Sequence, residues 1–247
     1  MRMLTAAVLV AAATAIAGPA LAADFPQYPP VVDIPDVDYG VQGAFYLRGS
    51  AAGNAFWTKE AYGIDCVICG VTPEEETFPV DEAGYGYSLG AGLGFETGTG
   101  LRFDATVDYV GNDGLIATGD AGEYDLKLRS TIALANVYYD FSLGGNGFGY
   151  NAAGGAFGYV GAGAGAAFNK VSIDASNGFP VPSGENTSFA AAGMVGVGYD
   201  FGAIVADIGY RGVYIADLDN DADFPANVRS ENNWLHEVRG TLRYRFN

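Results

Sequence analysis

The chain has 247 residues and a formal net charge of −17, a size that suits one domain of barrel scale and a charge that argues against nucleic acid as a partner. Aromatic residues make up 13% of the chain, which is too many for a disordered protein. Its 37 glycines follow no strict three-residue period, which excludes collagen.

The first 42 residues predict two segments that precede the folded domain. Arg2, an Ala-rich apolar run and a small-x-small site ending at Ala22 predict a signal peptide over residues 1–22. A membrane anchor is the alternative, but the apolar run is short and Gly18-Pro19 ends it. Repeated prolines among acidic residues then predict an extended periplasmic lead-in over residues 23–42.

From residue 43 to residue 247 the sequence alternates between apolar and polar residues, as β-strands do when their two faces meet different surroundings. We predict eight strands, near 43–50, 85–96, 101–109, 126–141, 157–168, 189–201, 204–214 and 234–246. In the fourth, the apolar residues change parity along the strand, which predicts a β-bulge near Asn136.

The last predicted strand is the most informative. Trp234 and every second residue to Phe246 form a mainly apolar face, whereas the other face carries Glu237, Arg239 and two further arginines. An apolar outside and a charged inside are typical of a closed barrel whose wall touches lipid and whose lumen is polar. The sequence therefore predicts an all-β fold, an eight-stranded antiparallel transmembrane up-and-down β-barrel.

Short and long links between the predicted strands alternate. Tight turns are expected at 97–100 and at Gly202, and long links at 54–83, 111–125, 170–186 and 216–233. Outer-membrane barrels have short periplasmic turns and long outer loops, so the long links should face outward and both termini should be periplasmic.

Charged residues of both signs share the inward parity, which predicts an ion-pair network in the lumen. A lipocalin-like soluble barrel with inverted faces is the alternative, but its interior would have to hold all of these arginines. The predicted network comprises Arg48, Glu96, Arg102, Asp104, Asp108, Asp207, Arg211, Glu237, Arg239, Arg243 and Arg245. Inward glycines such as Gly90 and Gly94 should make room for these side chains.

Five stretches from Phe45-Tyr-Leu-Arg-Gly49 to Leu242-Arg-Tyr-Arg-Phe246 resemble the opacity-type and OmpA-like small outer-membrane proteins, above all the alphaproteobacterial surface antigens of that class. The resemblance implies insertion by the outer-membrane assembly machinery, with Leu242, Tyr244 and Phe246 as the assembly signal. Such proteins usually end on Phe, whereas here Asn247 follows Phe246. The resemblance transfers no enzymatic activity and no cofactor.

Three features carry candidate chemistry. Cys66 and Cys69 are spaced like a redox pair or half of a zinc site. Because the sequence has no second cysteine pair and no nearby histidine, a disulfide within the loop is favoured.

An acidic run has aspartates at alternate positions, as an EF-hand loop does: Asp217, Asp219, Asp221 and Asp223. However, Ala222 and Val228 stand where an EF-hand requires Gly and Glu. A weak divalent-cation site and a solvated acidic loop both stay open. His236 is assigned to an interfacial aromatic belt rather than to a hydrolase.

The expected function is a non-enzymatic outer-membrane barrel of a Gram-negative cell envelope that displays acidic surface loops. A small ion-permeable, porin-like channel and an adhesin or surface-ligand binder are the alternatives. Expected partners are outer-membrane lipid and lipopolysaccharide, the assembly machinery during biogenesis and divalent cations at the acidic loops.

Overall fold

The computed structural model describes residues 43–58, 60–64, 75–119, 122–143, 155–175, 183–219 and 229–246. The predicted signal peptide and lead-in lie outside these residues, as do Cys66, Cys69, Asp221 and Asp223. Among the described residues no helix is long and apolar enough to cross a membrane.

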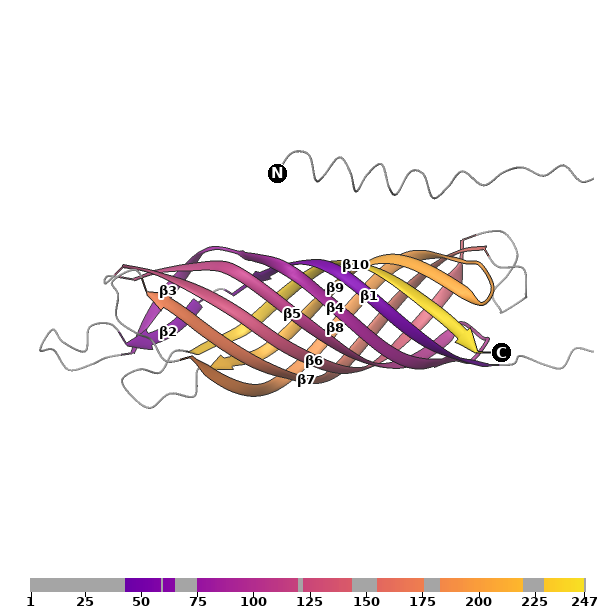
Figure 1. Cartoon of the computed structure of the whole chain (residues 1–247), viewed down its shortest axis with the longest axis horizontal. Coiled ribbons are helices and arrows are strands. Elements are labelled where there is room, and N and C mark those ends of the chain that lie inside the picture. The colour runs from indigo at the N-terminus through magenta and orange to yellow at the C-terminus, as the bar shows by residue number, and fades with distance from the viewer. Residues whose placement is uncertain are drawn as a thin grey trace, which may run out of the picture. The chain divides into compact units, whose positions relative to one another are not determined.

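Eight long strands form a closed antiparallel barrel (Figure 1). Each pairs with the next in the chain, and β1 pairs with β10 to close the ring, from Phe45 opposite Phe246 to Trp57 opposite Trp234. The eight strands are β1 (Ala44–Trp57), β4 (Gly84–Glu96), β5 (Leu101–Gly119), β6 (Gly122–Ser142), β7 (Gly155–Ala175), β8 (Gly184–Asp200), β9 (Ile204–Asp219) and β10 (Arg229–Phe246).

Two short strands extend the wall at one end. β2 (Glu60–Ile64) pairs with β3 (Glu75–Glu82) and with β10, and β3 also pairs with β5. The predicted long link at 54–83 therefore continues the sheet in part. We call the end that carries Trp57, Gly119 and Gly184 the loop end, and the end that carries Ala44, Glu96 and Phe246 the terminal end.

The tight turns predicted at the terminal end are confirmed. Gly98, Gly100 and Gly202 have φ values of 75°, 92° and 96°, a backbone region that favours glycine because it has no Cβ. The backbone N–H of Thr97 donates to the Leu101 carbonyl at 2.9 Å, and that of Phe201 donates to the Ile204 carbonyl at 2.9 Å.

The long link predicted at 111–125 is wrong. β5 runs to Gly119, β6 begins at Gly122, and these two glycines pair across the sheet, so only two residues connect the strands. Polar residues and glycines there belong to strands that are 19 and 21 residues long. About 9–11 residues of a strand suffice to cross a bilayer. The parts of β5 and β6 beyond that length lie outside the lipid, so their residues do not need to alternate between apolar and polar.

The bulge predicted near Asn136 is also wrong. β6 pairs with β5 and β7 without a register shift around this residue. Ile132, Leu134, Asn136 and Tyr138 all point inward and are buried, whereas Val137 points outward and is 42% exposed. The parity of the apolar residues changes because the lumen itself becomes apolar toward the loop end.

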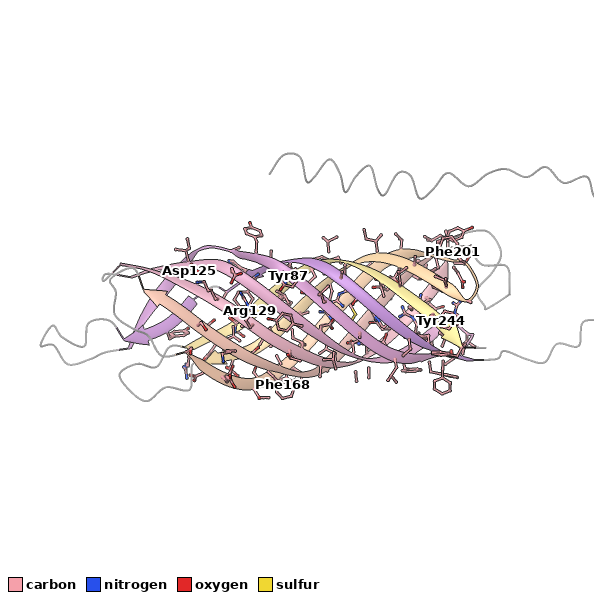
Figure 2. All side chains as sticks on the ribbon, viewed as in Figure 1. Tyr87, Asp125, Arg129, Phe168, Phe201 and Tyr244 are labelled. Carbon is pink, nitrogen blue, oxygen red and sulfur yellow. The ribbon has the colours of Figure 1, made fainter. Side chains whose placement is uncertain are left out.

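The outer wall is apolar, and two rings of exposed aromatic side chains border it (Figure 2). Aliphatic residues such as Leu89, Val107 and Val195 lie between the rings. Because the charged side chains of the barrel's core lie inside, the inverted-face soluble barrel is excluded. The ring toward the terminal end contains Phe45, Phe103, Tyr139, Tyr199, Phe201, Tyr244 and Phe246, and the ring toward the loop end contains Trp57, Tyr85, Tyr87, Tyr109, Phe168, Phe189 and Trp234.

Candidate functional site

The lumen is the candidate functional site, because inward side chains from all eight long strands meet there. It has a charged half toward the terminal end and an apolar half toward the loop end. The charged half brings together all eleven residues of the predicted network. Six arginines face seven carboxylates: Arg48, Arg102, Arg211, Arg239, Arg243 and Arg245 against Glu96, Asp104, Asp108, Asp140, Asp200, Asp207 and Glu237.

Two arginines and two carboxylates form a closed ring deep in this half. Arg211 contacts Asp108 at 2.7 Å and Glu237 at 2.5 Å, and Arg239 contacts the same carboxylates at 2.6 and 3.0 Å. The hydroxyl of Ser88 donates to Glu237, and Arg239 donates to the Ser50 hydroxyl. All four charged side chains are almost fully buried. Such buried pairs hold their charge because each carboxylate has two cationic partners.

Asp104 is the centre of a second group. It accepts hydrogen bonds from Arg48 at 2.7 Å, from the Tyr46 hydroxyl at 2.9 Å and from Asn136 at 2.7 Å. Arg48 also donates to the hydroxyl of Tyr138. Charge-assisted bonds of this kind are shorter and stronger than neutral ones, so Asp104 ties β1, β5 and β6 together across the lumen.

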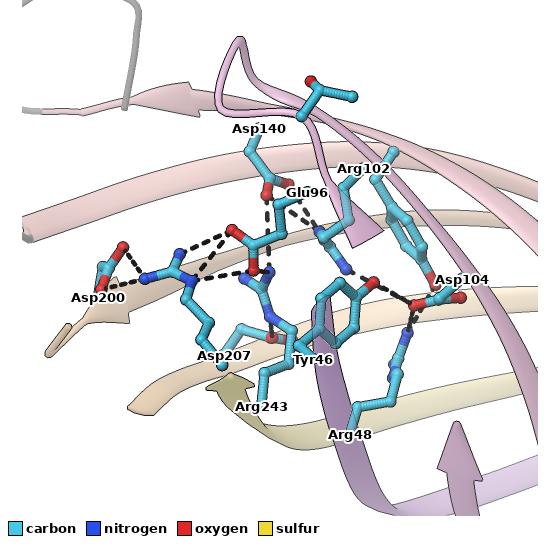
Figure 3. Close-up of polar contacts among 12 residues, drawn as sticks. Tyr46, Arg48, Glu96, Arg102, Asp104, Asp140, Asp200, Asp207 and Arg243 are labelled. Atoms are coloured by element: carbon cyan, nitrogen blue, oxygen red, sulfur yellow. Dashed lines mark hydrogen bonds and ion pairs between the residues drawn. The ribbon is translucent and has the colours of Figure 1, made fainter. Parts of the chain in front are cut away.

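The third group closes the terminal end of the lumen (Figure 3). Arg245 contacts Glu96 at 2.9 Å and Asp200 at 2.7 Å, and Arg243 contacts Glu96 at 3.2 Å. Arg243 also lies 3.6 Å from Asp207 and 3.8 Å from Asp140.

Arg102 links the second group to the third. It forms a two-pronged pair with Asp140, with both distances at 3.0 Å. Its guanidinium lies 3.9 Å from the centre of the Tyr138 ring. A planar guanidinium suits both a forked carboxylate contact and stacking on an aromatic face.

Inward glycines provide the space for these side chains. A Cβ on Gly90 would collide with the Asp108 carboxylate, and one on Gly94 would collide with the Tyr46 ring. On the opposite wall, a Cβ on Gly161 would meet the ring of Tyr138. The predicted role of Gly90 and Gly94 in making room for large inward side chains is confirmed.

Two carboxylates and the tyrosines of the lumen were not predicted from the sequence. Asp140 and Asp200 pair with Arg102 and Arg245, yet neither was placed inside. The outward alternation of Val137, Tyr139 and Phe141 already gave Asp140 the inward parity, and Asp200 lies at the last position of its strand. Continuing the parity of Asn136 to Asp140 would have found the first of them.

The apolar half corrects the expectation of a lumen that is polar throughout. Phe56, Ile132, Ile215 and Leu235 are each at most 2% exposed although they point inward. They belong to one packed cluster with Val110, Leu128, Leu134, Ala167, Val171, Ala190, Ala192, Val213 and Leu218. This cluster fills the lumen as a core fills a soluble protein.

A band of amides and hydroxyls lies along the same half. Asn54 donates to Ser88 at 2.9 Å and accepts from Asn112 at 2.8 Å. On the next two strands, β6 and β7, Ser130 donates to Asn169 at 2.7 Å. The amides and hydroxyls of this band are hydrogen-bonded to one another. A buried polar group without a hydrogen-bond partner would destabilise the fold.

A cavity of about 10 Å³ lies within the charged half, between Arg48, Arg211 and Arg239. That volume has room for a single water molecule.

The other candidate residues lie away from the lumen. His236 is on the outer wall, where Nδ1 is 2.6 Å from the Tyr210 hydroxyl and the ring stacks on Trp234. Asp217 and Asp219 lie at the end of β9, and the Asp217 carbonyl accepts a bond from Asn186. Within the described residues no group of three or more potential ligands could hold a metal ion.

No protein-family model and no curated protein sequence match the chain. Among solved structures it is similar to Neisserial surface protein A, with 20% identity, a TM-score of 0.50 and coverage of 83% of this chain and 99% of that one. It is also similar to OprG from Pseudomonas aeruginosa, with 16% identity, a TM-score of 0.46 and coverage of 82% and 96%. The first likeness shows the fold: a small eight-stranded barrel of the outer-membrane type.

Proposed function

We propose that this chain is a non-enzymatic outer-membrane β-barrel that is closed to ion flow and strengthens the envelope as a sealed, lipid-embedded wall. The observation that carries the proposal is the filled lumen. Charged pairs occupy one half and a packed apolar cluster occupies the other.

The two aromatic rings support the membrane location. Trp and Tyr concentrate at the two interfaces of a bilayer because their rings are apolar at one end and polar at the other. Tyr87 and Phe168 lie in the ring toward the loop end, and Phe201 and Tyr244 in the other ring (Figure 2). We place the loop end outside the cell and both termini in the periplasm, since short turns face the periplasm in barrels of this type.

The filled lumen favours a structural role over a porin-like channel. An ion that crossed the barrel would have to separate the Arg211–Glu237 and Arg239–Asp108 pairs and then displace Ile132 and Leu235. Both steps are unfavourable, because one exposes uncompensated charge and the other opens a cavity in packed apolar side chains.

Surface display is part of the same proposal. Asp113 and Glu185 are exposed at the loop end, where their side chains are 56% and 72% accessible. An adhesin or surface-ligand binder is the alternative role of that end. The proposed kinship with alphaproteobacterial surface antigens is compatible with either role.

Planar-bilayer conductance of the refolded protein, residues 23–247, tests the proposal. We expect no single-channel steps from the wild-type barrel. A variant with Phe56→Ala, Ile132→Ala and Leu235→Ala provides the matched control, because it removes apolar bulk from the lumen and leaves the ion pairs in place. Regular steps from the wild-type protein, equal in size to those of this variant, would establish the channel instead.

A further inference from the structure

Most arginines of this chain are inside the barrel, but three basic residues stand together on its outer wall. Lys127 and Arg129 are on β6, with the outward parity of Val137, and Lys170 is on β7. Arg129 and Lys170 are direct cross-strand partners. Three cations therefore share one patch at the loop end of a chain whose net charge is −17.

The wall is hollowed at this patch. A depression of about 380 Å³ is lined by two cations, Arg129 and Lys170, by Glu185 beside them, by the aromatic rings of Tyr109 and Phe168, and by polar residues that include Thr131, Asn186 and Thr187. Tyr109, Thr131, Phe168 and Thr187 form one cross-strand row, and Arg129 and Lys170 lie in the next row toward the loop end. The cations are thus one step beyond the aromatic ring, at the depth of lipid headgroups.

A smooth apolar strip continues from the hollow along the wall. The next rows toward the terminal end place Ala133 opposite Ala166 and Ala135 opposite Ala164, with Ala164 opposite Ala191. Larger side chains border this strip, among them Val107 and Val195, which are 55% and 50% exposed. A row of alanines lets an acyl chain lie close against the strands while a headgroup occupies the hollow above it.

Arg129 and Lys170 each pair with a carboxylate, but both ion pairs are exposed to solvent and can exchange partners. Arg129 pairs with Asp113 at 2.8 Å and Lys170 with Glu185 at 2.9 Å, but these side chains are between 38% and 72% exposed. Such surface pairs contribute about 0–1 kcal/mol, so an incoming phosphate can replace them. Two bonds from Arg129 to the carbonyls of Asn112 and Leu128, both 2.9 Å, meanwhile fix the guanidinium on the wall.

We propose that this hollow and the alanine strip below it form a binding site for one molecule of lipopolysaccharide. Arg129 and Lys170 bind a phosphate of its lipid A, and the strip receives an acyl chain. Arginine and lysine both suit phosphate, and the guanidinium can donate two parallel bonds. The inference rests on the proposed membrane location and orientation.

The test is a titration of the refolded barrel in nonionic detergent with bis-phosphorylated lipid A. We expect the variant with Arg129→Gln and Lys170→Gln to bind at least about tenfold more weakly than the wild type, because it loses the charge-assisted contacts to phosphate. Arg229→Gln is the matched control, because Arg229 is an exposed loop-end arginine on β10, paired with Glu231 at 3.0 Å. It should bind lipid A as the wild type does.

A second pair of variants tests the acyl strip. Ala164→Phe should weaken lipid A binding, whereas Ala51→Phe, at an exposed outward position on β1, should not. Dephosphorylated lipid A should bind weakly to the wild type, and inorganic phosphate should not displace the intact lipid. Equal affinity for the two lipids, equal losses in the double variant and in Arg229→Gln, or displacement by phosphate alone would overturn the proposal.

Failure of this inference is distinguishable from failure of the proposed function. Each variant is first examined for the shift in gel mobility that a folded barrel shows on heating. A barrel that folds, does not conduct and binds no lipid A contradicts only the lipid site. A wild-type protein that is soluble without detergent contradicts the membrane location itself.

Discussion

Arg239 is the side chain whose loss should disturb the lumen most directly. It contacts Asp108, Glu237 and the Ser50 hydroxyl, and it comes from the strand that closes the barrel. Its removal leaves two buried carboxylates to share Arg211. An ion pair on the surface of the barrel contributes little to the free energy of unfolding, because water solvates the charge that loses its partner.

We therefore expect Arg239→Ala to lower the free energy of unfolding by about 3–5 kcal/mol, the cost of leaving a buried charge without its partner. Arg229→Ala should change it by less than about 1 kcal/mol, because that arginine is exposed. Urea unfolding of both variants in detergent micelles measures the difference. Coincident unfolding midpoints would mean that water fills the charged half and screens its pairs.

Gly90 provides a second test at the scale of a single atom. A methyl group there meets the Asp108 carboxylate, whereas a methyl group on outward Gly49 meets nothing within 4 Å. Gly90→Ala should destabilise the barrel by about 1–3 kcal/mol, the usual cost of overpacking. Gly49→Ala should be neutral or stabilising, because alanine has fewer unfolded conformations to lose. Thermal unfolding of the two variants compares them, and an equal response would exclude tight packing at Gly90.

At the scale of the element, β10 combines two functions in one strand. Its inward face supplies four residues of the charged network, and its outward face ends on Tyr244 and Phe246, whose rings are 5.4 Å apart. The strand also closes the ring by pairing with β1. The resemblance to small outer-membrane proteins implies that the outward aromatics are read during assembly.

Replacing Tyr244 and Phe246 by Ser should reduce the amount of protein in the outer membrane while export continues. The control replaces Tyr199 and Phe201, a similar exposed pair 4.7 Å apart at the end of β8. Both double variants lose the same interfacial aromatic area, so a stronger defect in the first indicates an assembly signal. Fractionation of cells with quantitative blotting gives the result, and equal levels would refute the signal.

β6 allows the apolar half to be tested within one strand. Leu134 points inward and is 3% exposed, and Val137 points outward and is 42% exposed. Leu134→Ala should cost about 2–5 kcal/mol, because it leaves a cavity in the packed cluster. Val137→Ala should cost less, since lipid or detergent fills the space that it vacates. Denaturant unfolding measures the loss of stability in each variant. A larger loss for Val137→Ala than for Leu134→Ala would contradict the inward position of Leu134 and support the predicted bulge.

At the scale of the whole molecule, stability comes from a closed ring with a filled centre and an apolar wall. Each of the eight long strands has two neighbours, so the sheet has no free edge over its membrane-spanning length. The wall alone would not be soluble, because it exposes a continuous apolar belt.

We expect the mature protein to require detergent, to be rich in β-structure and to migrate differently on gels before and after boiling. The closed ring should resist dodecyl sulfate at room temperature, because its backbone bonds are all internal. Circular dichroism and paired gels measure this. A monomer that stays soluble without detergent and shows a single gel position would exclude the barrel as a membrane protein.

The sequence by itself determined the eight long strands of the barrel and the faces of most of them, but not the short strands β2 and β3. In β10 every second residue from Trp234 to Phe246 points outward, as the alternation indicates, because a strand between lipid and lumen must change chemistry at each residue. Arg211 and Glu237 were placed inside for the same reason, and the register then made them cross-strand partners.

Only the tertiary structure decided how the lumen is filled. Alternation indicates which residues share a face, but an inward apolar residue such as Leu134 and an outward one such as Val137 have the same local pattern. Which face is inside depends on the neighbouring strands, and closure of the barrel brings Ile132, Ile215 and Leu235 into one packed cluster. The partners of Asp140 and Asp200 likewise come from distant strands. Local periodicity specifies a strand, whereas closure of the barrel determines which side chains meet across its centre.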